Sequence, residues 1–231
     1  MIRLFLTICV LVGIFVLLIS KGVLWFVYPD RDLYPLRGID VSHHKGSIDW
    51  EKVASDDVSF AFIKATEGDD FVDSSFISNW NSAREQKIPV GAYHFYSLRF
   101  EGAMQAQNFI KTVPIASGSL PPVVDLEYGG NSKQRPPRED FQKELRSYLE
   151  MISEHYGKTP ILYTTYDFYH DYLEGAFNEY PLWIRDLFKT PKDTLPWQFW
   201  QYKNRGHIDG IEGYVDLNVF RGLQFPRDYI N

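Results

Sequence analysis

The sequence predicts an α/β protein built as an irregular parallel β/α (TIM-like) barrel of eight strands, preceded by one N-terminal transmembrane helix. Two observations support this fold class. From Arg37 onward, short apolar runs alternate with longer segments of helical periodicity, which is typical of a parallel barrel. Before Arg37, residues 4–19 are uncharged and almost wholly apolar. A chain of 231 residues with 45% hydrophobic residues is long enough for one barrel domain.

The first two thirds of the barrel domain alternate between strand and helix patterns. Helices are expected to begin after Asp49, whose carboxylate is a suitable N-cap, and at residues 73–87, 102–112 and 138–156. The last of these helices is long and amphipathic, so one face can pack on the sheet. Short apolar strands separate the helices, and they are expected at residues 37–42, 59–65, 89–95, 121–127 and 160–164.

The last third contains strand patterns at residues 181–184, 197–202 and 214–218 with little helix between them, so the barrel is expected to have few helices there. Active sites of β/α barrels gather at the C-terminal ends of the strands. Single residues at such ends, for example Asp40 and Thr164, could cap helices instead. The whole set of strand ends nevertheless predicts a polar cleft, because nearly all are polar or ionisable: Asp40, Lys64 with Glu67, His94, Asp125 with Glu127, Thr164, Arg185, Gln201 and Asp216.

The N-terminal segment predicts a membrane anchor. A spanning helix needs about 20 apolar residues, and the run that starts at Leu4 continues through Val27 if Lys21 extends its amine toward the interface. A cleaved signal peptide is the alternative, but no small-residue cleavage site follows the run. The expected organisation is an anchor at residues 1–28 with Trp25 and its aromatic neighbours at the membrane interface, a linker at 29–36 and the catalytic barrel at 37–231.

Composition excludes some functions. The formal net charge is −6 and no Lys/Arg-rich run is present, so the chain lacks the electrostatic pattern of a nucleic-acid-binding protein. The single cysteine, Cys9, lies in the apolar N-terminal run, so the barrel has neither a disulfide nor a thiolate metal ligand. Aromatic residues make up 16% of the sequence, and such rings either fill the interior or line a sugar-binding cleft.

Asp125 and Glu127 form the most informative pair. They are separated by one residue on an otherwise apolar strand, so both side chains point to the same face, with α-carbons roughly 6.5–7 Å apart. Two carboxylates that face one space push their pKa values apart, which suits one acid and one charged group. Cleavage of a glycosidic bond needs this division of labour. An ion pair with Lys64 or Arg185 is the alternative interpretation.

Other chemistries are less well supported. His43 and His44 could join the carboxylates around a metal, but neighbouring residues of an extended chain point to opposite faces, and no H-E-x-x-H motif is present. We therefore expect no catalytic metal and no cofactor. A G-x-S-x-G nucleophile motif and a phosphate-binding loop are also absent. His94 is interpreted as a structural histidine at a strand end.

Eight short motifs occur in the order found in a known family. They are G-I-D-V-S at 38–42, I-K-A-T-E-G at 63–68, G-A-Y-H-F at 91–95, P-V-V-D-L-E at 122–127, P-I-L-Y-T at 160–164, P-L-W-I at 181–184, W-Q-Y at 200–202 and V-D-L-N at 215–218. Together they resemble glycoside hydrolase family 25, the muramidases (lysozymes) of bacteria and their phages. The resemblance covers about residues 37–225.

The resemblance implies cleavage of the β-1,4 bond between N-acetylmuramic acid and N-acetylglucosamine in peptidoglycan. Carried over by position, Glu127 is the general acid. Asp125 is its partner, which either stabilises the oxocarbenium-like state or orients the substrate's N-acetyl group as an internal nucleophile. Asp40 and Asp216 line the same cleft. The residues expected to bind substrate are Lys64, Glu67, Tyr93, Phe95, Tyr163, Trp200 and Gln201.

The sequence departs from the family pattern at a few positions. Lys45 stands where the family often has Gln before Gly46, and Arg185 follows Ile184 where a small residue is common. The loop at residues 128–137 is also more basic than expected. These departures bear on the preference of the sugar subsites and not on the acid.

The implied partners are the glycan strands of peptidoglycan and, through the N-terminal helix, the membrane. We expect a single-pass membrane protein, monomeric, with its catalytic domain on the periplasmic or extracellular side where the substrate lies. Two other functions stay open: a glycan-binding protein without catalysis on the same barrel, and a hydrolase of another amino-sugar polymer.

Overall fold

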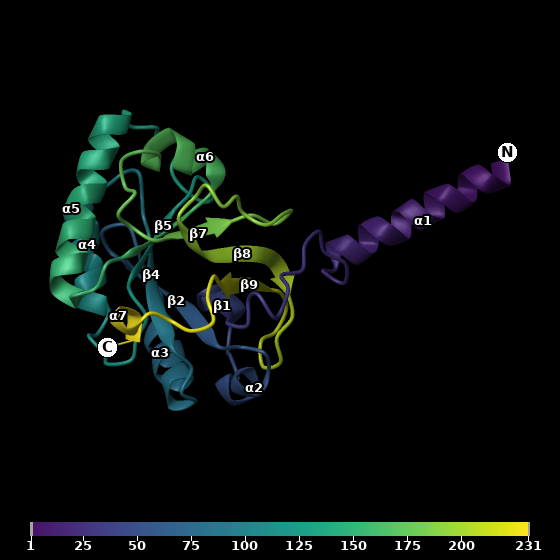
Figure 1. The fold of residues 1–231 in the computed structure, drawn as a ribbon, viewed down its shortest axis with the longest axis horizontal. Coiled ribbons are helices and arrows are strands. Elements are labelled where there is room, and N and C mark those ends of the chain that lie inside the picture. Colours follow the sequence, from purple (N-terminus) through teal and green to yellow (C-terminus); the bar gives the residue numbers. More distant parts are fainter. Residues whose placement is uncertain (1, 231) are drawn as a thin grey trace.

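The computed structural model describes residues 2–230, and most of them form a closed β-barrel with helices packed on part of its outside (Figure 1). Residues 1 and 231, the outer limits of the expected anchor and barrel, lie outside the described residues. The strands of the barrel neighbour one another in the order β1, β9, β8, β7, β6, β5, β4 and β2, and pairing of β1 with β2 closes the ring. Their bounds are β1 (Arg37–Val41), β2 (Phe60–Glu67), β4 (Val90–Phe95), β5 (Val123–Leu126), β6 (Ile161–Thr164), β7 (Leu182–Arg185), β8 (Trp197–Gly206) and β9 (Val215–Phe220). The short strand β3 (Phe71–Val72) extends β2 outside the ring.

The eight-stranded β/α barrel confirms the predicted fold class, and its irregularity lies in β9. Strands β1 to β8 of the ring pair in parallel, whereas β9 is antiparallel to both β8 and β1. The segment that joins β8 to β9, residues 207–214, is too short for the crossover that a parallel pair requires, so the two strands form a hairpin. The expectation that the last strand runs parallel is therefore wrong.

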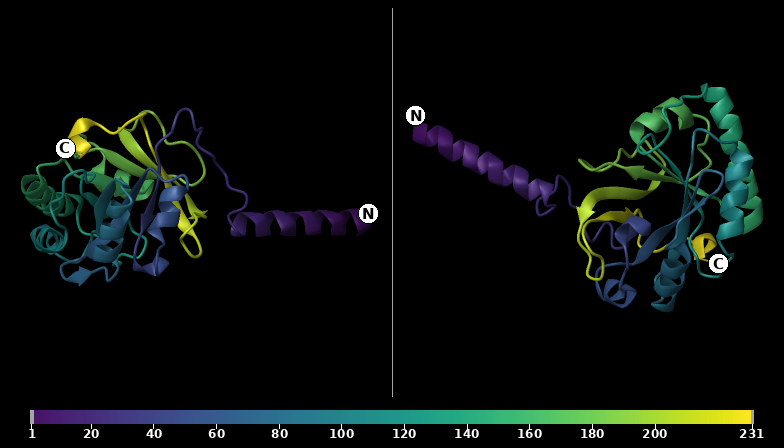
Figure 2. Two further views of the ribbon diagram at one scale, coloured as in Figure 1. Left: turned by 90° about the horizontal axis from the view of Figure 1, so that it is seen from below. Right: turned by 180° about the vertical axis from the view of Figure 1, so that it is seen from behind.

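Helices cover the outside of the barrel on one side, and few of them follow β6, as predicted (Figure 2). Asp49 caps α2 (Trp50–Ser55), because its side chain accepts a hydrogen bond from the backbone N–H of Lys52. The long helix α5 ends at Gly157, which adopts a left-handed conformation with φ 65°. The helices and helical turns are η1 (His43–Lys45), α2 (Trp50–Ser55), α3 (Phe76–Glu85), α4 (Gly102–Thr112), α5 (Arg138–Tyr156), α6 (Tyr166–Phe168), η2 (Tyr169–Leu173) and α7 (Arg227–Ile230).

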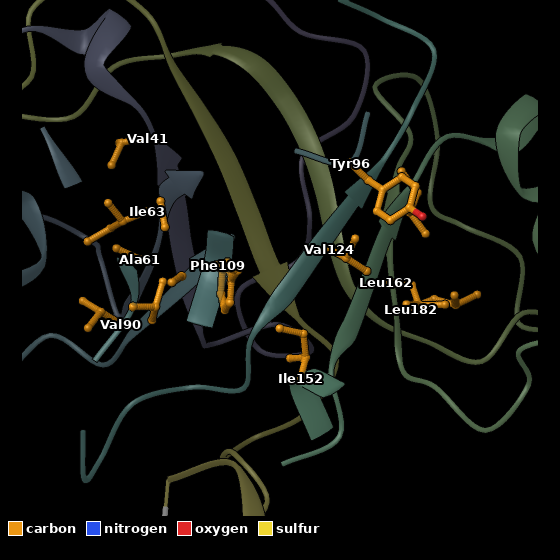
Figure 3. Packing of buried hydrophobic residues seen from close by; sticks show 14 of the residues in the cluster. Val41, Ala61, Ile63, Val90, Tyr96, Phe109, Val124, Ile152, Leu162 and Leu182 are labelled. Atoms are coloured by element: carbon orange, nitrogen blue, oxygen red, sulfur yellow. The ribbon is translucent and has the colours of Figure 1, made fainter. Parts of the chain in front are cut away.

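Two apolar layers hold the barrel together. The outer layer lies between strands and helices and includes Ile63, Val124 and Leu162 (Figure 3). The inner layer fills the barrel with aromatic rings, among them Phe62, Trp183 and Phe199. Because alternate residues of a strand point to opposite faces, each strand contributes to both layers. Each fully buried side chain of this size stabilises the fold by about 1.5–3 kcal/mol.

The N-terminal helix α1 (Ile2–Ser20) projects away from the barrel (Figure 1). Its stretch Arg3–Ser20 is apolar enough to cross a membrane, and none of that stretch is buried by the rest of the chain. A signal sequence near the N-terminus also meets these criteria of length and composition.

Residues 20–28, which we call the docked segment, lie against the β8–β9 hairpin. The indole N–H of Trp25 donates to the carbonyl oxygen of Tyr202 at 2.7 Å, and Lys203 Nζ donates to the carbonyl oxygen of Gly22 at 2.8 Å. The Phe26 ring lies 4.8 Å from the ring of Phe188 in the loop after β7. Residues 29–36 also run along the barrel, where the ring of Tyr34 packs beside Trp200.

Gly22 is the point of closest approach between the docked segment and the hairpin. Its φ is +66°, and a Cβ there would lie 2.2 Å from the carbonyl oxygen of Arg205. Gly22→Ala should therefore displace the docked segment and lower the Tm of the detergent-solubilised chain. We expect a cost of about 1–3 kcal/mol, or roughly 2–4 °C per kcal/mol.

Gly13→Ala is the matched control, because a Cβ at Gly13 meets nothing within 4 Å. Differential scanning calorimetry of both variants provides the measurement. An unchanged Tm in Gly22→Ala would show that the docked segment contributes nothing to the stability of the barrel.

Candidate active site

Four carboxylates from three strands line one pocket at an end of the barrel. Asp40 comes from β1, Asp125 from β5, Glu127 from the residue after β5, and Asp216 from β9. The pocket has a volume of about 240 Å³. It is lined by Asp40, Tyr93, Val123, Asp125, Glu127, Tyr163, Trp183, Arg185, Gln201, Asn204 and Asp216.

The alternation of β5 produces the central pair. Asp125 and Glu127 both line the pocket, whereas Val124 and Leu126 between them are buried in the outer apolar layer. Val123 continues the inward-facing series beneath the pair. The expectation that Asp125 and Glu127 share one face is confirmed.

Asp216 reaches the pocket by a different route from the one expected. It is the second residue of the antiparallel strand β9 and pairs in register with Asp40 of β1. Because β9 runs in the opposite direction, the start of this strand lies at the same barrel end as the C-terminal ends of the parallel strands. The position of Asp216 in the cleft was expected, but the reason given for it was wrong.

A hydrogen-bond network fixes Asp40. Its Oδ2 accepts from Asn218 Nδ2 at 2.7 Å and from Gln201 Nε2 at 3.0 Å. The indole N–H of Trp183 donates to Asn218 Oδ1 at 2.9 Å, and the Tyr163 hydroxyl donates to Gln201 Oε1 at 3.0 Å. Burial raises the pKa of Asp40, although the hydrogen bonds from Asn218 and Gln201 act against this. The network therefore orients a carboxylate that the pocket partly desolvates.

Asp125 and Glu127 have different surroundings. Asp125 Oδ1 is buried and accepts no hydrogen bond within residues 2–230. Burial, and then the neighbouring charges of Glu127 and Asp40, raise the pKa of Asp125 well above its usual value. Burial also raises the pKa of Glu127, but the Arg185 guanidinium, 3.8 Å from Glu127 Oε2, lowers it. The pocket thus favours the protonated form of both carboxyls relative to a carboxyl in water.

Asp216 completes the acidic set. Burial and the charge of Asp40 raise the pKa of Asp216 to about 8. Lys45 Nζ lies 3.7 Å from Asp216 Oδ2 and lowers that pKa, and the same ammonium donates to the carbonyl oxygen of Tyr214 at 2.6 Å. Two cations, Lys45 and Arg185, therefore face four carboxylates, so the pocket favours positive charge.

Three expected substrate-binding residues form a separate cluster beside the pocket. A β-bulge between Lys64 and Thr66 shifts the register of β2 against β4, so that Glu67 pairs with Phe95. Lys64 Nζ consequently lies 2.7 Å from Glu67 Oε2 and 5.1 Å from the centre of the Phe95 ring. Lys64, Glu67 and Phe95 do not line the pocket itself.

Trp200 was expected in the cleft, but the structure places it on the outer side of the barrel sheet. It is fully buried in the outer apolar layer, and its indole N–H donates to the carbonyl oxygen of Asp186 at 2.7 Å. Its neighbour Gln201 points inward, so Trp200 must point outward on the same strand. The remaining expected residues Tyr93, Tyr163 and Gln201 line the pocket.

His43 and His94 have structural partners, and His44 packs against His43. His43 and His44 lie in the turn η1 with ring centres 4.0 Å apart, so the alternation of an extended chain does not apply to them. His43 Nδ1 lies 2.7 Å from Asp73 Oδ2. His94 is buried against Thr66 Oγ1 at 2.7 Å and Gln105, and burial lowers the pKa of His94 to about 3. Its structural interpretation is confirmed.

Sequence reasoning did not assign several pocket residues to the site. Trp183 and Asn218 could have been found, because each lies two residues from an inward-facing polar residue on its own strand. Arg185 was expected at the polar cleft as a strand end and was noted as a departure from the family pattern, but it was assigned no role in binding or catalysis. Asn204 lies near the end of β8, in the hairpin that the sequence did not reveal.

Paired, desolvated carboxylates over an aromatic barrel interior are the arrangement that cleavage of a glycosidic bond requires, so the geometry fits a glycoside hydrolase. The family model described as Glycosyl hydrolases family 25 matches residues 39–211, and the chain belongs to this family.

Known proteins agree with this assignment. The structure of a family 25 glycosyl hydrolase from Bacillus anthracis is 42% identical, with a TM-score of 0.81, covering 87% of this chain and 94% of that one. Lysozyme M1 of Streptomyces globisporus is 32% identical over 208 residues, 83% of this chain and 69% of that protein. The protein YegX of Escherichia coli K12 is 41% identical over 196 residues, 82% of this chain and 71% of YegX.

The raised pKa of Asp125 predicts a pH-dependent stability. Because its folded-state pKa lies above its unfolded value, this carboxyl favours folding when protonated, and the contribution is lost as pH rises through the folded-state pKa. Asp125→Asn removes the titrating group. The Tm of the variant should therefore exceed that of the wild type at about pH 8, by roughly 2–4 °C per kcal/mol.

The difference should disappear at about pH 4, where the wild-type carboxyl is protonated. Thermal unfolding at the two pH values measures the effect, and Asp70→Asn, at an exposed position, is the control. A variant whose Tm falls equally at both pH values would contradict the inferred cost of burying the Asp125 charge.

Proposed function

We propose that the protein is a muramidase that hydrolyses the β-1,4 bond between N-acetylmuramic acid and N-acetylglucosamine in peptidoglycan. The observation that carries the proposal is the pair Asp125 and Glu127 on one face of β5, within a pocket that raises the pKa of both. Family membership and the likeness to lysozyme M1 support a substrate in the cell wall.

In the proposed reaction Glu127 donates its proton to the glycosidic oxygen, and the C–O bond breaks as positive charge develops on the sugar ring. The charge is stabilised by the carboxylates around it, or the carbonyl oxygen of the substrate's N-acetyl group attacks the anomeric carbon. A water molecule then adds to that carbon and returns a proton to Glu127. Asp125 either faces the developing charge directly or accepts the N–H of the N-acetyl group.

Substrate binding is proposed to place the proton of the pair on Glu127, where acid catalysis requires it. The free pocket raises the pKa of both carboxyls. Asp125 Oδ1 is a buried acceptor without a donor, and an N–H group from the sugar would favour its charged form. The charge on Asp125 would then raise the pKa of Glu127. Asp40 and Asp216 are proposed to support the pair, with Tyr93, Tyr163 and Gln201 in contact with sugar.

Glu127→Gln tests the assignment of the acid. General acid catalysis contributes about 10²–10⁴-fold, so release of new reducing ends from purified peptidoglycan should fall at least about 100-fold in the detergent-solubilised full chain. Glu154→Gln, at an exposed position of α5, should act like the wild type. Mass spectrometry of the reduced products should find muramic acid at the new ends. Glucosamine ends would rule out the proposed bond, and full activity of Glu127→Gln would rule out the acid.

We also infer that α1 is retained and holds the barrel at the outer face of the membrane, with the chain divided at residues 1–28, 29–36 and 37–231. The contacts of Trp25 and Gly22 with the β8–β9 hairpin support a segment that stays on the protein. The chain should remain in the membrane fraction after an alkaline wash, with an intact mass that includes α1. A soluble mature chain that begins after Ser20 would identify the segment as a cleaved signal.

A further inference from the structure

A second pocket adjoins the catalytic one. It lies between the segment that follows β6 and the loop between β7 and β8, and we call it the loop pocket. Its volume is about 1050 Å³, against about 240 Å³ for the catalytic pocket. Arg185 lines both, so the two spaces meet at this side chain. A substituent on a sugar bound beside Glu127 therefore has a direct way into the loop pocket.

Each acidic residue of the loop pocket has one carboxylate oxygen engaged within the protein. Glu174 Oε2 lies 3.0 Å from His170 Nδ1. The Thr165 hydroxyl donates to the carboxylate of Asp167. Asp186 Oδ1 accepts from the backbone N–H groups of the two residues that follow Leu187, at 3.0 and 3.1 Å, and so holds the loop in shape.

The cations of the loop pocket are not engaged in the same way. Lys189 and Lys192 are exposed, and within residues 2–230 neither ammonium group makes an ion pair with a carboxylate. Arg185 has only Glu127, at 3.8 Å, which is beyond hydrogen-bond distance. The lining thus holds three cations and three carboxylates, and among residues 2–230 only the carboxylates have hydrogen-bond partners within the lining. The ammonium groups of Lys189 and Lys192 therefore remain available to an anionic ligand.

We propose that the loop pocket binds the carboxylates of the peptide stem carried by the muramic acid residue at the cleavage site. This inference rests on the proposed function. The stem leaves the sugar through its lactyl group, and four extended residues span at most about 14 Å. Its acidic side chains and C-terminus supply the charges that Lys189 and Lys192 lack. A neutral sugar would leave these cations unpaired, so the charge favours the stem over a further sugar subsite.

The double variant Lys189→Gln/Lys192→Gln tests the proposal on two substrates. One is intact peptidoglycan, and the other is the same glycan after an amidase has removed the stems. Exposed ion pairs are individually weak, so kcat/KM on intact peptidoglycan should fall about five- to tenfold, mainly through KM. On stem-free glycan the change should stay below about twofold. Lys111→Gln/Lys143→Gln carries the same charge change at exposed sites on α4 and α5 and should alter neither value.

A binding experiment gives an answer that does not depend on activity. A free acidic tetrapeptide stem, and the same peptide with its carboxylates amidated, are titrated into the detergent-solubilised Glu127→Gln chain by calorimetry. The acidic peptide should bind more tightly than the amidated one, and the double lysine substitution should abolish the difference.

The outcomes separate the two proposals. Equal losses on both glycan substrates, no loss on either, or equal binding of the two peptides would overturn stem recognition. Inorganic phosphate that competes as well as the acidic peptide would show a general anion site and would also overturn it. Failure of the wild type to cleave any glycan would instead reject the proposed function, and peptide binding would still decide the role of the loop pocket.

Discussion

The aromatic filling of the barrel is the constraint on which the active site depends. Phe62, Trp183 and Phe199 occupy the interior, and Gly91 on the neighbouring strand leaves room for the Phe62 ring, since a Cβ there would lie 2.5 Å from it. These aromatic rings therefore form an apolar floor beneath the active-site pocket. Carboxylates placed above this floor lose water on one side, which is the main reason that the pKa values of Asp40, Asp125, Glu127 and Asp216 are all raised.

The antiparallel strand β9 supplies what the parallel strands alone could not. A hairpin places Asp216 and Asn218 beside Asp40, and Asn218 links Asp40 to Trp183 of β7. The carboxylate that needs orienting is thereby connected to the aromatic floor through two hydrogen bonds. The last third of the barrel has few helices, but the β8–β9 hairpin, which stands there in place of a helical crossover, supplies part of the site.

Much of the site was predictable, because it follows from the alternation of side chains between the two faces of each strand. The spacing of Asp125 and Glu127 fixed their common face, and polar strand ends indicated where the pocket lies. The position of Trp200 was predicted wrongly, because the W-Q-Y motif does not indicate whether Trp200 or Gln201 faces inward. The bulge in β2 and the direction of β9 depend on pairing between distant segments, so no local pattern reveals them. The hydrogen bond of Trp25 to Tyr202 joins residues 177 positions apart and was equally inaccessible.

The docked segment has a mechanical consequence. With residues 20–28 held on the β8–β9 hairpin and Tyr34 packed on the barrel, almost no free chain remains between α1 and the catalytic domain. If α1 spans the bilayer, the short connection fixes the distance between the active-site pocket and the lipid surface. The enzyme could then not search the depth of the wall. It would cut only the layer of glycan that lies at that distance.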